Sequence, residues 1–364
     1  MRLKKFDLYS QKNFFDLSLL MSVLGLVIFG LVMVYDASVT QGLRDFQDAN
    51  YYIRQQLIWT LIGLTVLFLF SRFDYKKFKL LAKPLIIIST LLLLAVFIPS
   101  LGISGGGAHR WLNIGPVTLQ PAEIIKITGI IFLATIFEKR TRFLPFASLV
   151  IVMTIITALL QRDLGSTVVF VLTVTAVYFA AGAPIWHFFV ALPAALTGFT
   201  LLIITSAYRS KRILAFMDPF SDPQGFTYHI LQVLIALGSG GLLGLGLGHS
   251  RQKFEYIPEV VTDSIFAVVG EELGFLGGLF LIFLFAFVVY RGLKIAENCS
   301  DNFGRILALG LISLIGIQAI INISSMIALL PLTGVPLPFI SYGGSALVAN
   351  LTAVGILLNI SKNG

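Results

Sequence analysis

The segment RILALGLISLIGIQAIINISSMIAL, residues 305–329, carries a single charge, on Arg305 at its first position. A helix needs about 20 mostly apolar residues to cross the hydrocarbon core of a bilayer, and this segment has that length and character. The whole chain is similar, because 57% of its 364 residues are hydrophobic and 12% are charged. A soluble domain has about a quarter of its residues charged. The composition therefore predicts an all-α polytopic membrane protein.

Nine further segments share the apolar character of residues 305–329. The ten predicted membrane spans are 17–35, 56–71, 80–98, 122–137, 144–160, 164–181, 187–205, 273–290, 305–329 and 343–360. Ten spans place both termini on one side of the membrane, and the short loops on that side hold most of the Lys and Arg residues. The positive-inside rule therefore predicts cytoplasmic termini. This topology accounts for the net charge of +8, so we expect no nucleic-acid partner.

We expect one domain, residues 1–364, with three extracytoplasmic segments. They are a long insert at about 206–272 between the seventh and eighth spans, the 99–120 loop with a turn at Gly105–Gly107, and the proline-rich segment 331–342. Residues 1–16 are polar and basic, and we do not expect a cleavable signal peptide. The single cysteine, Cys299, excludes an intrachain disulfide.

The long insert ends in FEYIPEVVTDSIFAVVGEELG, residues 254–274. Pro258 disfavours a continuing helix, and Thr262 is a candidate N-cap for a helix that begins near Asp263. Asp263 in the first turn could act as a general base or could stabilise the helix N-terminus electrostatically. Glu271 and Glu272 are adjacent and do not face each other on a helix, so structural roles are at least as well supported as catalysis.

Cations and glycines precede this acidic end. The glycine-rich run Gly238–Gly248 could present backbone N–H groups to a pyrophosphate or could allow close packing, and packing is the better-supported reading. Lys253, just after the run, is then the predicted phosphate contact. The cations of 209–212 anchor to lipid headgroups or bind substrate. Histidines 109, 187, 229 and 249 show no metal-site spacing.

Two further sets of charges lie in or at the ends of spans. Glu123 and Lys126 are three residues apart on one face of the fourth span, where unpaired charges are unfavourable. Asp163, at the start of the sixth span, could pair with Arg110 or Lys126. For all of these residues, a structural ion pair is favoured over direct catalysis.

Several motifs occur in a fixed order along nearly the whole chain. They are Arg110–Trp111, Gln120–Lys126, Asp163–Gly165, Phe216–Pro219, Gly240–Gly248, Lys253, Tyr256–Glu259, Thr262–Asp263, Gly270–Gly274 and Gly334–Ser345. In this order they resemble the SEDS family (shape, elongation, division and sporulation). The motifs at Val34–Ser38, Asp218–Pro223 and Leu330–Gly334 are more similar to its FtsW branch than to its RodA branch.

The resemblance implies a peptidoglycan glycosyltransferase with ten transmembrane helices in a bacterial cytoplasmic membrane. Such an enzyme polymerises lipid II at the outer face and works with a class B penicillin-binding protein. The family's essential aspartate corresponds to Asp263. Candidate substrate-binding residues are Arg110, Arg209, Arg212, Lys253, Glu259 and Ser341, and candidate structural or cavity residues are Glu123, Lys126, Asp163, Glu271 and Glu272. No cofactor is required by the sequence, although a divalent cation, Mg²⁺ or Mn²⁺, is compatible with it.

Two positions depart from the family pattern. Val261 stands where the family usually has His, and Arg162 stands where it usually has Pro. Neither departure alters Asp263.

Two other functions remain open at this point. A lipid II flippase would need ionisable groups along a path through the bilayer, and a non-catalytic scaffold that activates a penicillin-binding protein would need no base. The acidic residues gather at one membrane surface, which favours surface chemistry over transport.

Overall fold

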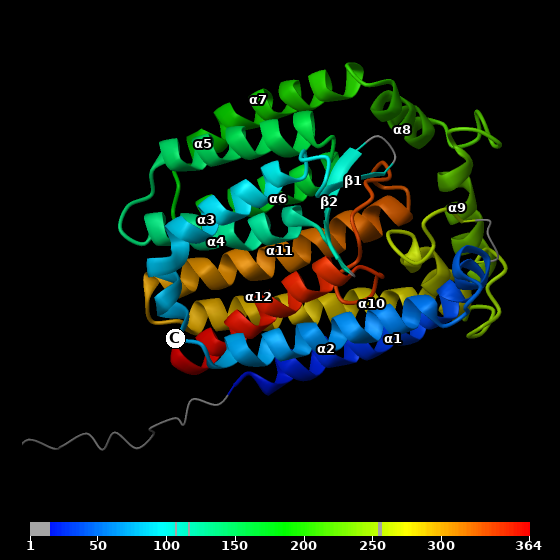
Figure 1. The fold of residues 1–364 in the computed structure, drawn as a ribbon, viewed down its shortest axis with the longest axis horizontal. Helices are drawn as coiled ribbons and strands as arrows, with labels where there is room; N and C mark the ends of the chain where they lie inside the picture. Colours follow the sequence, from blue (N-terminus) through cyan, green and yellow to red (C-terminus); the bar gives the residue numbers. More distant parts are fainter. Residues whose placement is uncertain (1–14, 106–107, 116, 254–256) are drawn as a thin grey trace, which may run out of the picture.

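The computed structural model describes residues 15–105, 108–115, 117–253 and 257–364. Long helices lie side by side in a bundle (Figure 1). The helices at the predicted spans are α1 (Leu17–Phe46), α2 (Tyr51–Arg72), α3 (Phe78–Ala95), α4 (Pro121–Phe137), α5 (Phe143–Thr154), α6 (Leu164–Ala180), α7 (Ile185–Ile204), α10 (Ile265–Asn298), α11 (Asn302–Met326) and α12 (Gly344–Asn363). A 3₁₀ turn, η1 (Tyr75–Lys77), precedes α3, and a π-helical turn, η2 (Ile155–Leu160), extends α5.

The all-α polytopic class is confirmed. Within the described residues, eight helices, with η1 and η2 joined to their neighbours, are long and apolar enough to cross a membrane. The other two predicted spans, α4 and α6, are helices of 17 residues each. Every predicted span therefore coincides with a helix, while the number of membrane crossings stays a prediction. Lipid favours this outcome because a helix satisfies its own backbone hydrogen bonds.

The loops contain structure that the sequence analysis did not predict. The 99–120 loop forms a three-stranded antiparallel sheet of β1 (Gly102–Gly105), β2 (Ala108–Ile114) and β3 (Val117–Leu119). The long insert contains α8 (Ala207–Met217) and α9 (Tyr228–Gly240). Two residues of the predicted turn at Gly105–Gly107 lie outside the described residues. The basic residues within 1–14 also lie outside them. The three strands, of 4, 7 and 3 residues, are too short to give a clear periodicity in the sequence.

The core lies around α11 and α12, which are the most buried of the candidate spans. Helix α11 packs against α10, α6 and α4, and α12 packs against α2. Helix α7 lies on the outside of the bundle and has no buried side chain (Figure 1). Its apolar surface is therefore available to lipid.

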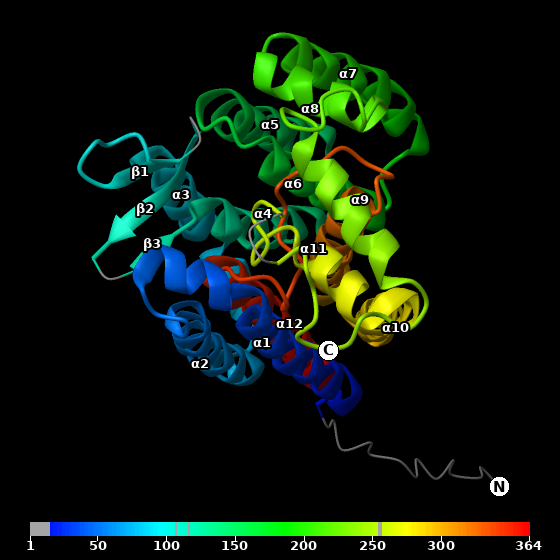
Figure 2. The same ribbon diagram turned by 90° about the vertical axis from the view of Figure 1, so that its right-hand side faces the viewer.

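One end of the bundle collects the sheet, α8, α9 and the 331–343 segment, on the right in Figure 1 and facing the viewer in Figure 2. The opposite end carries η1, the α10–α11 turn and the C-terminus. The three segments predicted to share one side of the membrane thus lie together. This end holds Asp263.

Candidate active site

Asp263 belongs to a tight turn, not to a helix. The backbone N–H groups of Thr262 and Ser264 both donate to the Glu259 carbonyl, at 3.1 and 3.2 Å. Helix α10 begins at Ile265, with Ser264 as its N-cap residue. The prediction that Thr262 caps a helix beginning near Asp263 is therefore wrong. The Thr262 hydroxyl lies 3.0 Å from the carboxylates of both Glu259 and Asp263.

Two other parts of the chain hold this turn. Asn322 of α11 donates from Nδ2 to the Asp263 carbonyl at 2.7 Å and to the Val335 carbonyl at 2.8 Å. Ser341 donates from Oγ to the Thr262 carbonyl, and the Tyr342 N–H donates to the Val261 carbonyl at 2.8 Å. The proline-rich segment thus fixes the backbone around the carboxylate. Ser341 of this segment, which we predicted to bind substrate, uses its one hydroxyl proton in the hydrogen bond to the Thr262 carbonyl.

Sequence reasoning did not identify Asn322. It is a fully buried amide near the C-terminal end of the apolar α11. A polar residue inside a membrane span is a functional signal, and this one could have been noticed.

The Asp263 side chain is 8% exposed. Burial raises the pKa of its carboxyl above the usual 3.8, while the Thr262 hydrogen bond and the charges of Arg212 and Arg110 act in the opposite direction. A Cβ added at Gly334 would lie 3.7 Å from Asp263 Oδ2 and 4.0 Å from Arg212 Nη1. Gly334 therefore lies between a buried base and a cation. A raised pKa brings a carboxylate closer to what a general base needs.

A cavity of about 210 Å³ lies beside this arrangement. It is lined by Tyr208, Lys211, Arg212, Ala215, Phe226, His229, Ile230 and Leu332. Arg212 is held in place by donating to the Leu332 carbonyl at 2.9 Å and to the Tyr208 hydroxyl. The lining combines two cations with apolar side chains, which suits an anionic group attached to a hydrocarbon chain.

A second group of cations, from the sheet and from α8, lies around the connection between η2 and α6. Arg110 donates to the Arg162 carbonyl at 3.2 Å and lies 3.7 Å from Asp163. Arg209 donates to the carbonyls of Leu202 and Ala158 at 3.0 and 2.7 Å. Burial, followed by Arg162 and Arg110, lowers the pKa of Arg209. Of the two partners considered for Asp163, the structure gives Arg110.

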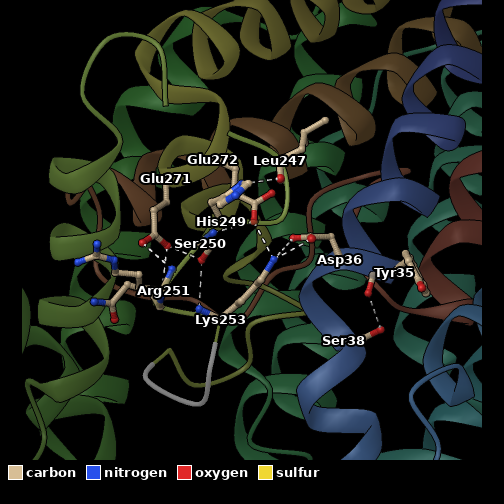
Figure 3. A network of polar contacts seen from close by, with 11 residues as sticks. Tyr35, Asp36, Ser38, Leu247, His249, Ser250, Arg251, Lys253, Glu271 and Glu272 are labelled. Carbon is tan, nitrogen blue, oxygen red and sulfur yellow. Dashed lines mark hydrogen bonds and ion pairs between the residues drawn. The ribbon is translucent and has the colours of Figure 1, made fainter. Parts of the chain in front are cut away.

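Lys253 is enclosed by carboxylates (Figure 3). Its Nζ lies 2.7 Å from Asp36 of α1 and 3.0 Å from Glu272 of α10, and its side chain is 7% exposed. In this position Lys253 forms ion pairs with two carboxylates and ties the insert to two helices. The arrangement does not support the phosphate contact expected for it. The partner Asp36 was not identified as a site residue, although its motif was.

Glu271 and Glu272 both organise the segment before Lys253 (Figure 3). Glu271 accepts from the Ser250 hydroxyl and, at 3.0 Å, from the Arg251 N–H. Glu272 accepts from the Ser250 N–H at 3.1 Å. Both side chains are buried, so neither faces solvent. The geometry agrees with the structural reading of these two residues.

The glycine-rich run packs against a break in α10. Gly274 has φ 67 and ψ −167, which interrupts the helical hydrogen bonds. The N–H groups of Leu245 and Gly246 donate to the carbonyls of Glu271 and Glu272, each at 3.0 Å, and Phe275 N–H donates to the Gly241 carbonyl at 2.9 Å. The run therefore satisfies backbone groups of α10, as the close-packing reading predicted.

The intramembrane pair is also structural. Lys126 Nζ lies 2.7 Å from Glu123 Oε1, and both side chains are nearly fully buried in α4. Asp163 accepts from the Ser166 N–H at 3.1 Å and caps α6.

Among the described residues, no group of three or more His, Cys, Asp or Glu side chains could hold a metal ion.

Comparison with known proteins agrees with the sequence motifs. The FtsW/RodA/SpoVE family model, described as a cell cycle protein, matches residues 17–364. Stage V sporulation protein E of Bacillus subtilis (strain 168) is 40% identical over 355 residues, covering 95% of this chain and 97% of that protein. A probable peptidoglycan glycosyltransferase FtsW of Trichlorobacter lovleyi is 40% identical over 356 residues, covering 95% and 93%.

A solved structure extends the match to three dimensions. A chain from the study of how a peptidoglycan synthase complex coordinates polymerization and crosslinking has a TM-score of 0.76 with this chain at 28% identity. The match covers 96% of this chain and 98% of that one. The motifs, the family model and the fold agree, and the chain belongs to the FtsW/RodA/SpoVE family of cell cycle proteins, the SEDS family.

Proposed function

We propose that this chain, a peptidoglycan glycosyltransferase of the SEDS family, polymerises lipid II into glycan strands at the outer face of the bacterial cytoplasmic membrane, with Asp263 as the general base. One observation carries the proposal. The buried Asp263 carboxyl, whose pKa is raised, lies close to Arg212, which lines a cavity that is both cationic and apolar. Lipid II has the matching chemistry, because its pyrophosphate joins a sugar to a polyprenyl chain.

The proposed step transfers one proton and exchanges one bond. The Asp263 carboxylate accepts the proton of the 4-hydroxyl on the acceptor sugar. The resulting oxygen attacks C1 of the donor sugar, and the bond from C1 to the pyrophosphate oxygen breaks with inversion. Undecaprenyl pyrophosphate leaves with the electron pair.

The cavity cations act on the leaving group. Arg212 is preorganised by its bonds to Leu332 and Tyr208, and Lys211 lines the same cavity. Cations already aimed at a developing phosphate charge stabilise the transition state more than mobile ones do. Arg110 lies near enough to Asp263 to act on its charge, and Arg209 lies near enough to Arg110 for the two cations to add to the positive potential.

A divalent cation is compatible with the donor set but needs substrate to complete its coordination. Mg²⁺ is usually held by one or two carboxylates plus substrate phosphates. Glu259 and Asp263 are the carboxylates that would hold it, because both lie 3.0 Å from the Thr262 hydroxyl. A bound Mg²⁺ or Mn²⁺ would neutralise pyrophosphate charge. We propose that the chain requires no resident cofactor.

The match to a peptidoglycan synthase complex supports a crosslinking partner for this chain, which we propose to be a class B penicillin-binding protein. Relatives named FtsW and SpoVE, at 36 to 40% identity, support its assignment to the FtsW branch. The multi-pass fold supports membrane lipids as its surroundings. The excess of Lys and Arg in the short loops of the terminal side supports cytoplasmic termini and an extracytoplasmic Asp263 end.

A transporter or a scaffold would not itself make glycan strands from lipid II, whereas the proposed enzyme would. The test is lipid II polymerisation by the purified wild type and Asp263→Asn, each with a partner free of transglycosylase activity. Glycan strands from the wild type alone would support the enzyme, with an intact complex as the control. Equal polymer from both would remove Asp263 from the mechanism. No polymer from either, with lipid II crossing vesicle bilayers, would favour the transporter.

A further inference from the structure

His229 of α9 is hydrogen-bonded to the residue that follows Asp263. Its Nε2 lies 2.7 Å from Ser264 Oγ, and Ser264 Oγ donates to the Pro258 carbonyl at 3.0 Å. Pro258 and Ser264 are the two ends of the turn that contains Asp263. The three groups form one chain of hydrogen bonds from the insert to this turn.

The direction of each bond follows from the chemistry of the groups. A carbonyl oxygen only accepts, so the single proton of the Ser264 hydroxyl points to Pro258. His229 must then donate from Nε2 to Ser264 Oγ. The Ser264 side chain is fully buried, so a hydroxyl that lost its donor would have no water to replace it.

His229 also lines the cation-lined cavity with Arg212 and Lys211. One imidazole therefore has an edge on the proposed pyrophosphate site and a nitrogen on the turn of the base. Sequence reasoning considered His229 only as a metal ligand and found no spacing for one.

We propose that His229 is a positioning residue for glycosyl transfer, holding Asp263 through Ser264 while the cavity is occupied by the donor. The inference rests on the proposed function of Asp263. The effect is indirect, because His229 acts through Ser264 and the Pro258 carbonyl. A base displaced by about 1 Å can lose about a hundredfold in rate.

The surroundings keep the imidazole neutral. Burial, with Arg212 as the next cause, lowers the pKa of His229 to about 4, and Glu259 acts in the opposite direction. A neutral imidazole has one N–H, and the bond to Ser264 uses it. The other ring nitrogen, Nδ1, stays an acceptor.

The experiment compares His229→Leu, which removes the donor, with His229→Gln, whose amide can replace Nε2–H. Lipid II polymerisation is measured in the full-length protein with its transpeptidase partner. We expect His229→Leu to lower kcat by about tenfold to a hundredfold, with a much smaller change in KM, and His229→Gln to keep kcat within about threefold of wild type. The double variant with Ser264→Ala should lose no more than the worse single variant, because both remove one chain of bonds.

His187→Leu is the matched control. His187 also bonds a hydroxyl, that of Tyr178, at 2.6 Å, but in α7 away from the turn. Unfolding temperatures of all variants separate misfolding from misplacement.

Each outcome decides a different claim. A folded His229→Leu with wild-type kcat would overturn the positioning role while leaving Asp263 intact, provided Asp263→Asn is inactive in the same assay. Loss of activity in both Leu and Gln variants, or additive losses with Ser264→Ala, would also overturn it. An active Asp263→Asn would instead overturn the proposed function.

Discussion

Asp263 is a carboxylate on which burial and neighbouring charges act in opposite directions. Burial raises its pKa, while Thr262, Arg212 and Arg110 limit the rise. A carboxylate whose pKa is raised binds a proton more tightly once it is deprotonated, which is the property that a general base needs.

The rate of polymerisation should therefore fall at low pH. The base works only when deprotonated, so kcat should decline as pH drops through a midpoint above 3.8, the usual value for Asp. Arg212→Gln removes a charge that lowers the pKa, so its midpoint should move to higher pH. The measurement is the pH profile of kcat for the wild type and Arg212→Gln.

Lys294→Gln is the control for this profile, because it removes the same charge from the exposed surface near the opposite end of α10. Its midpoint should equal that of the wild type. A midpoint for Arg212→Gln that is unchanged or lower would show that Arg212 does not act on the base.

At the scale of elements, α10 and the glycine-rich run stabilise each other. The break at Gly274 frees backbone groups, and residues 241–246 bond to them. Gly244 has φ 82, and a Cβ there would lie 2.1 Å from the Glu272 carbonyl. Gly241 has φ 54, and a Cβ there would meet nothing within 4 Å.

This pair of glycines separates two effects of an added methyl group. Gly241→Ala brings only backbone strain, about 1–3 kcal/mol at such a dihedral. Gly244→Ala brings strain and a clash with backbone that also carries Glu272. We expect Gly244→Ala to lower the unfolding temperature in detergent clearly more than Gly241→Ala. Equal decreases would mean that the contact between the run and α10 relaxes without loss.

At the scale of the whole molecule, Lys253 connects segments far apart in the chain. Its bonds to Asp36 and Glu272 join α1, the insert and α10 at the end that holds Asp263. A buried ion pair contributes little net stability, but removing one partner leaves the other charge unpaired.

Lys253→Met should therefore be strongly destabilising, by about 3–5 kcal/mol. Lys79→Met is the control, since its pair with Glu138 is partly exposed and worth about 0–1 kcal/mol. Thermal unfolding of both variants in detergent is the measurement. A Lys253→Met protein as stable as Lys79→Met would show that the triad does not hold the insert.

The spans were predictable because hydropathy and length are local properties of the sequence. Their ends were not, because α1 continues 11 residues past the predicted end of its span at residue 35 and α10 begins at Ile265, before its predicted start. The α1 extension is polar and is held by tertiary contacts such as that between Asp36 and Lys253. The α10 extension starts with a short apolar run and ends in Glu271 and Glu272, which separate it from the predicted span. The three-stranded sheet depends on hydrogen bonds between strands of one loop. Its strands of 4, 7 and 3 residues are too short for an alternation of polar and apolar residues to reveal them in the sequence.

The site residues that belong to a sequence motif were predictable. Those that reach the site only because the fold brings distant segments together were not. The pairing of Glu123 with Lys126 follows from their spacing. The family motif marks Asp263, whereas spacing alone left two roles open for it. Asn322 and His229 reach the Asp263 turn from other helices, so their neighbours in sequence give no sign of this. Lys253 looked available for phosphate because its two carboxylate partners are 217 and 19 residues away.

The most direct test of the central claim is the initial rate of glycan-strand formation from lipid II by Asp263→Asn, beside the wild type and Asp218→Asn. Asp218 is an exposed aspartate of the same insert, so its variant controls for loss of charge. Removing a general base typically lowers the rate by about 10²–10⁴-fold, and we expect a loss of that size for Asp263→Asn alone. A folded Asp263→Asn that polymerises lipid II at the wild-type rate would contradict the account.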